Sequence, residues 1–200
     1  MKLFLLGVGV TGTLPSRHTY RYLKEYQSEV PASFQLPGLL RNEQKIQLIT
    51  SAASAALAGL NAQQSLQSQC GCIVSTRWDG RFPTLTDERD GRLLSTADLP
   101  PSRVALTLVA HVAESCIPML FNLQGPSCTI SSKQGLQAAL EIAALFLTTG
   151  RAPLMLAQEF DLALPVNLCQ AGFEPQASYA LSVIVALQPW DRKVLGEIIV

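Results

Sequence analysis

Charged residues are scarce in this chain. Lysine, arginine, aspartate and glutamate together make up 15% of its 200 residues, whereas about a quarter of the residues are charged in a typical globular domain. The deficit predicts that a protein partner covers part of the surface. A compact monomer with a large core is the alternative. Positive and negative residues balance to a formal net charge of zero, so no excess charge is present to attract nucleic acid or an anionic membrane.

Metal ligands are few as well. Histidine occurs only twice, as His18 and His111, and the five cysteines form no CxxC pairs. The spacing Cys70-Gly71-Cys72 is shorter than that of the usual zinc sites. We therefore expect no bound metal, and we interpret the cysteines as reduced and buried.

Long hydrophobic runs are missing too. No uninterrupted apolar stretch reaches the length of a membrane-spanning helix. The opening KLFLLGVGV is apolar like a short signal peptide, but no A-x-A cleavage site follows it. The sequence thus predicts a soluble, cytoplasmic protein without membrane insertion. Its length suits a single domain over residues 1–200.

The glycines near the start raise the question of a nucleotide cofactor. Residues 7–12, GVGVTG, have the spacing G-x-G-x-x-G of a dinucleotide-binding turn. A strand before the glycines and a helix over Arg17–Tyr26 would fit that motif. It also needs a second strand ending in an acid, and residues 27–40 contain two prolines and no β-branched run. We expect no nicotinamide or other cofactor here.

Apolar spacing defines the other elements. Ile46, Ile49, Ala53 and Leu57 recur at helical intervals, which predicts a helix with a wide apolar face. Residues 77–103 carry much of the charge and predict a surface loop. Further helices are expected over 109–121 and 136–147, and strands over 70–76, 128–131, 153–157 and 180–187. This order predicts an α/β domain with a mixed, mostly parallel sheet flanked by helices.

The stretch from Gly125 to Asp161 resembles the nucleophile region of β-ketoacyl synthases. GPSCTISSKQGLQAALEIAALFLTTGRAPLMLAQEFD is similar to their Gly-Pro-Ser turn, strand, strand-to-helix turn, small-residue helix and following strand. LFLLGVGVTGTLP resembles the opening strand of that family, and EQKIQLITSAASAALAGL and CGCIVST resemble its next helix and strand. The resemblance spans nearly the whole chain but only the N-terminal half of a synthase. It implies a single thiolase-like half domain.

The resemblance also shows where catalytic groups are missing. Synthases use a cysteine nucleophile and two histidines from their second half, and neither His18 nor His111 matches those histidines. Counting forward from Gly125 puts Gln134 at the nucleophile position, whereas counting back from Gly135 puts Ser132 there. Neither residue is a cysteine. We expect no catalytic residue in this chain.

A glutamine at that position resembles the chain length factors of type II polyketide synthases. Short chain length factors of about half the fold accompany the ketosynthases that build aryl polyenes, and they are the most similar in size. The resemblance implies a heterodimer or heterotetramer with a ketosynthase, an indirect relation to its acyl carrier protein, and a role in shaping the acyl tunnel. The interface would include Cys128, Thr129, Ile130 and Ser131, and the tunnel would be lined by Leu106, Val109, Ala110, Ala113 and Met119.

Two other functions stay open at this point. The chain could be a priming subunit that decarboxylates malonyl groups through Gln134, or an acyltransferase that uses Ser132. It could also be a homodimeric module that binds acyl chains. Each alternative predicts either turnover by the isolated chain or self-association.

Overall fold

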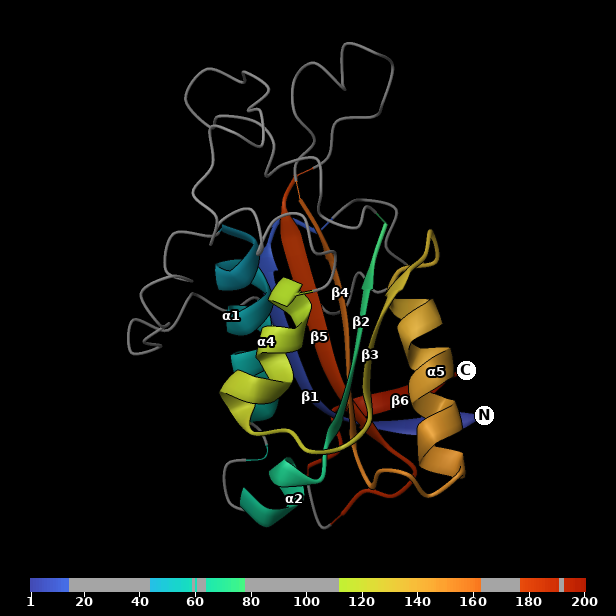
Figure 1. Ribbon diagram of the computed structural model, residues 1–200. Helices are drawn as coiled ribbons and strands as arrows, with labels where there is room; N and C mark the ends of the chain where they lie inside the picture. The colour runs from blue at the N-terminus through green and yellow to red at the C-terminus, as the bar shows by residue number, and fades with distance from the viewer. Residues whose placement is uncertain (15–43, 59, 61–63, 78–111, 163–176, 191–192) are drawn as a thin grey trace, which may run out of the picture.

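A computed structural model of the chain describes residues 1–14, 44–58, 60, 64–77, 112–162, 177–190 and 193–200. These residues form one six-stranded sheet between helices (Figure 1). The strands lie in the order β3-β2-β4-β5-β1-β6. The strands are β1 (Lys2–Gly12), β2 (Gly71–Thr76), β3 (Ser127–Ser131), β4 (Met155–Asp161), β5 (Tyr179–Ala186) and β6 (Gly196–Ile199).

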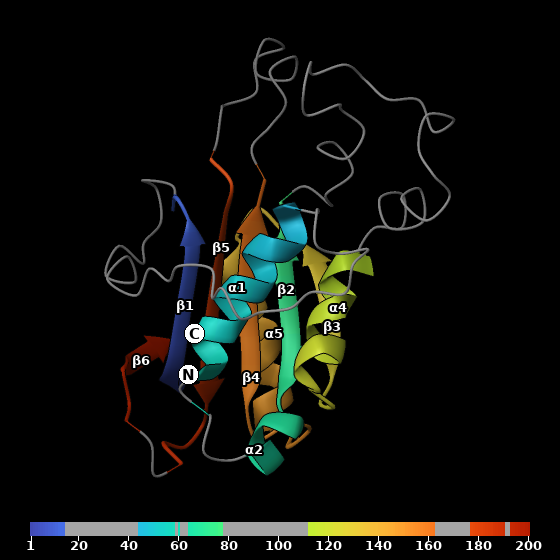
Figure 2. The ribbon, with the colours of Figure 1, turned by 90° about the vertical axis from the view of Figure 1, so that its left-hand side faces the viewer.

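Four helices accompany the sheet within the described residues. They are α1 (Gln44–Ala58), α2 (Gln64–Ser68), α4 (Val112–Phe121) and α5 (Leu136–Thr148). Figures 1 and 2 show α1 and α4 on one face of the sheet and α5 on the other. The sheet is therefore the middle of three layers, and β2, β4 and β5 lie buried on both faces.

The sheet is mixed, as the sequence predicted, but its parallel part is smaller than expected. β2 pairs in parallel with β3 and with β4. The pairings β4–β5, β5–β1 and β1–β6 are antiparallel. Three of the five pairings are thus antiparallel. Parallel strands need a crossover connection such as a helix. α4 lies in the connection from β2 to β3, and α5 connects β3 to β4, which lie on either side of β2.

Successive side chains of a strand point to opposite faces of the sheet, so the hydrophobic core consists of two clusters, one on each face. Ile73, Ala157 and Val183 face α5 in one cluster, and Val74, Leu156 and Ile184 belong to a second cluster beneath α1. The small residues of α1 let that helix approach the sheet closely, because Ala52, Ala53 and Ala56 are fully buried.

The opening glycines serve this close approach. Gly7 and Gly9 lie inside β1 rather than in a loop after it. A Cβ atom on Gly7 would lie 2.1 Å from the carbonyl oxygen of Ala56, and one on Gly9 would lie 2.0 Å from that of Ala52. The G-x-G spacing therefore comes from strand-to-helix packing.

Most of the predicted elements are present in the described residues. The helix from 136 and the strands near 70–76, 128–131 and 180–187 end within two residues of expectation. The strand predicted over 153–157 runs from Met155 to Asp161 instead, and α2 and β6 were not predicted. The expected helix Arg17–Tyr26 and nearly all of the loop 77–103 lie outside the described residues.

Candidate functional site

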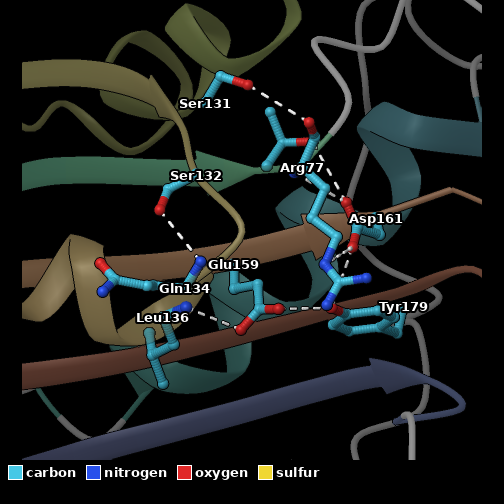
Figure 3. Close-up of polar contacts among 9 residues, drawn as sticks. Arg77, Ser131, Ser132, Gln134, Leu136, Glu159, Asp161 and Tyr179 are labelled. Atoms are coloured by element: carbon cyan, nitrogen blue, oxygen red, sulfur yellow. Dashed lines mark hydrogen bonds and ion pairs between the residues drawn. The ribbon is translucent and has the colours of Figure 1, made fainter.

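The carboxyl ends of the parallel strands meet the start of α5. Ser132 continues the β3 ladder by one residue, because its N–H donates to the carbonyl of Thr76 at 2.9 Å. The chain then turns through residues 132–135 into α5. Functional groups commonly gather where parallel strands end, so this turn is the candidate site (Figure 3).

The two residues proposed for the nucleophile position lie on the outside of this turn. Gln134 is exposed, and its N–H donates to the hydroxyl oxygen of Ser132 at 3.1 Å. In Figure 3 the Gln134 side chain points away from the carboxyl groups beneath the turn. Among the described residues, no histidine lies near either side chain, since His18 and His111 are outside them.

Glycine occupies the residue that precedes α5. Gly135 has φ 57° and ψ −126°, a region that L side chains rarely adopt. A Cβ atom there would lie 2.4 Å from the Cδ and Oε1 atoms of Glu159. The volume that a side chain at position 135 would need is thus filled by a carboxyl group from β4.

Glu159 caps α5 from below the turn. Its Oε2 accepts a hydrogen bond of 2.8 Å from the N–H of Leu136, and the hydroxyl of Tyr179 donates to its Oε1 at 2.5 Å. The side chain is 4% exposed. A carboxylate at a helix N-terminus is stabilised by the unpaired N–H groups and by the helix dipole.

A second acid lies two residues along the same face of β4. Oδ1 of Asp161 accepts a hydrogen bond of 3.0 Å from the N–H of Arg77, and the Arg77 Nε atom lies 3.8 Å from Oδ2. Burial raises the pKa of Asp161 to about 6, with a contribution from nearby Glu159, despite the opposing effect of Arg77. The hydroxyl of Ser131 donates to the carbonyl of Arg77 at 3.3 Å, which links this group to β3.

The other notable surface is the edge strand β3. It pairs with β2 on one side, and no described strand lies on the other side. Ser127, Cys128 and Ser131 are exposed. A cavity of about 160 Å³ opens between this edge and α4, lined by Cys72, Val74, Ser115, Pro118, Ser127, Cys128 and Thr129.

The described thiols are poor candidates for a nucleophile. Burial raises the pKa of Cys70 to about 12, and it raises the pKa values of Cys72 and Cys128 as well. The reactive form of cysteine is the thiolate, and the raised pKa values disfavour that form in all three groups. Within the described residues no three potential ligands come together as a metal site requires.

The structure describes only some of the predicted site residues. Cys128, Thr129, Ile130 and Ser131 lie together on β3. Met119 lies on α4 and is 69% exposed, while Ala113 is on the same helix with its side chain outside the described part. Leu106, Val109 and Ala110 are outside the described residues. The interface and tunnel assignments therefore stay predictions.

The buried polar group beneath the turn was missed at the level of sequence. Glu159, Asp161, Tyr179 and Arg77 come from three strands or their ends. The sequence EFD at the end of an apolar run was the available signal, because two acids two residues apart on a strand share one face.

Solved structures with the same fold are ketosynthase assemblies and their relatives. No protein-family model and no curated protein matches the chain. A chain of AntDE:AntF, a type II polyketide synthase acyl carrier protein in complex with its ketosynthase, superposes with a TM-score of 0.59 at 14% identity, covering 92% of this chain and 57% of that one.

Two ketosynthase–chain length factor complexes give similar superpositions. The ishigamide complex has a TM-score of 0.56 at 15% identity, over 82% of this chain and 50% of that one. The complex of ApeO with ApeC from Xenorhabdus doucetiae has a TM-score of 0.53 at 15% identity, over 80% and 64%. The chain therefore spans less than two thirds of each, and it has the fold of a ketosynthase-like half. No helix of the described residues is long and apolar enough to cross a membrane.

Proposed function

We propose that this chain is a non-catalytic, chain-length-factor-like subunit that pairs with a ketosynthase and forms part of its acyl tunnel. The observation that carries the proposal is the position of β3 at the edge of the sheet, with exposed residues on it and a cavity beside it. An edge strand presents backbone groups that a second chain can pair with. Fold neighbours that are ketosynthase–chain length factor complexes support this partner.

The strand-to-helix turn supports the non-catalytic part of the proposal. A glycine precedes α5, its side-chain volume is filled by Glu159, and Gln134 points outward. An amide forms no acyl thioester. Of the type II systems, we propose those that build aryl polyenes, because of the resemblance in size to their short chain length factors.

Co-expression with a type II polyketide ketosynthase from the same organism tests the pairing. We expect one complex on a sizing column, and decarboxylation of a malonyl carrier protein only when the ketosynthase is present. Decarboxylation by the isolated chain that is lost in Gln134→Ala would instead favour the priming enzyme. A stable homodimer that does not bind the ketosynthase would favour the acyl-binding module.

A further inference from the structure

The space beneath Gly135 is built like a binding site for a carboxylate. The N–H of Leu136 and the hydroxyl of Tyr179 both donate to the carboxyl group of Glu159, from α5 and from β5 (Figure 3). Tyr179 is fully buried and Glu159 nearly so. The helix dipole of the 13-residue α5 adds to the attraction for a negative group.

A third polar group lies beside this space. Ser75 of β2 is the register partner of Glu159, so both side chains lie on the α5 face of the sheet. Ser75 is fully buried, and its hydroxyl has no hydrogen-bond partner among the described residues. A buried, unpaired hydroxyl is costly, and this one belongs to the residue paired in register with Glu159.

We propose that the turn is a carboxylate-binding site which Glu159 occupies from within, and that this carboxylate and a side chain at position 135 exclude each other. A Cβ atom at position 135 would lie within 2.5 Å of both carboxyl oxygens. Displacing the Glu159 side chain to accommodate a Cβ atom at position 135 is unfavourable, because the N–H of Leu136 and the hydroxyl of Tyr179 would lose this acceptor. The proposal deepens the non-catalytic role by naming what closes the turn.

A cycle of variants of the full chain tests the exclusion. Gly135→Ala is expected to lower the melting temperature by at least about 5 °C, through backbone strain and contact with the carboxyl group. In Glu159→Ala the same change should cost measurably less, because the contact with the carboxyl group is gone and only the backbone strain at position 135 remains. In the matched control Glu159→Gln, which keeps the volume, it should cost as much as in the wild type. Equal losses in all three backgrounds would overturn the exclusion.

Chemical rescue tests the carboxylate site itself and does not need Gly135→Ala to fold. Sodium acetate at about 100 mM should raise the melting temperature of Glu159→Ala at least about 2 °C more than sodium chloride does at the same concentration. The wild type should show no such difference, and adding Ser75→Ala should reduce the rescue. If acetate and formate stabilise Glu159→Ala no more than chloride does, the site proposal is wrong and Glu159 serves packing alone.

These measurements use the chain without a ketosynthase. Their failure would leave the proposed pairing standing, and failure to pair would leave the carboxylate site standing. The two proposals are therefore separately refutable.

Discussion

At the scale of single residues, the buried acids of β4 are the most unusual feature of the described chain. Asp161 is 1% exposed, and the Nε atom of Arg77 lies 3.8 Å from its Oδ2. Glu159 lies on the same face of β4, and the Tyr179 hydroxyl lies 2.5 Å from Oε1 of Glu159 and 3.3 Å from Oδ2 of Asp161. Burial disfavours the charged form of a carboxyl group more than these contacts favour it. Asp161 is therefore expected to make folding depend on pH.

The sign of this dependence follows from the raised pKa. In the unfolded chain the Asp161 carboxyl group titrates near 3.8, and in the folded chain its pKa is about 6. The folded state binds the proton more tightly, so this group lowers stability as pH rises from about 4 to 6, and the loss is complete above that range. Asp161→Asn should remove this loss and gain on the order of 1–3 kcal/mol at pH 7 relative to pH 4. Urea unfolding of both proteins at pH 4, 5, 6, 7 and 8 measures it.

The control for this prediction is Glu141→Gln, because Glu141 is an exposed acid on α5. Its pH profile should match that of the wild type. Parallel profiles for Asp161→Asn and the wild type would show that Asp161 titrates normally in the folded chain.

At the scale of elements, the close approach of α1 to β1 depends on two glycines. A Cβ atom at position 9 would lie 2.0 Å from the Ala52 carbonyl oxygen and 2.9 Å from the Cβ of Ala55. Backbone atoms cannot move away as a flexible side chain can. Gly9→Ala should therefore lower the free energy of unfolding by at least about 2 kcal/mol, measured by urea unfolding.

Gly196→Ala is the matched control, also in a strand, since its nearest neighbour would be the Leu5 Cδ2 atom at an ordinary 3.9 Å. It should change the free energy of unfolding by less than about 0.5 kcal/mol. A Gly9→Ala variant as stable as this control would mean that α1 shifts freely, contrary to the packing described here.

Sequence patterns predicted those elements whose burial has a clear period. The apolar spacing of α1 and α5 and the buried runs of β1, β2 and β5 are strong signals. β6 was missed because four residues, GEII, with exposed Glu197 and Ile199, show no run. The direction of pairing was only partly predictable, since register and direction depend on contacts between distant segments. The same holds for the Glu159 contact with Gly135, which joins residues 24 positions apart.

At the scale of the whole molecule, tunnel shape and partner binding are separable. Ala113→Phe on α4, and equally Ala110→Phe, should shorten the product of the proposed ketosynthase complex, because close-packed walls yield little to added volume. Mass spectrometry of the product measures the length, and a sizing column shows whether the complex persists. Ala58→Phe, at the exposed end of α1, should leave the length unchanged. Unchanged length in both the Ala113→Phe and the Ala110→Phe variants, with the complex intact, would remove these residues from the tunnel wall.

Pairing along β3 can be disturbed with little effect on the isolated chain. In the ladder between β2 and β3, the N–H of Cys72 donates to the carbonyl of Pro126, and the N–H of Ser132 donates to the carbonyl of Thr76. The backbone N–H and C=O groups of the even-numbered residues of β3 therefore point toward β2, and those of Thr129 point toward the outer edge. Proline is tolerated on edge strands because it removes only an outward N–H.

Thr129→Pro should lower the free energy of unfolding of the isolated chain by less than about 2 kcal/mol. In the complex it would remove a bond between the chains, so we expect the dissociation constant to rise at least about tenfold. Thr129→Ala, which keeps the N–H, should bind within about threefold of the wild type. If Thr129→Pro binds the ketosynthase as tightly as Thr129→Ala does, the partner contacts another surface, and the scarcity of charge must be explained by a different face of the molecule.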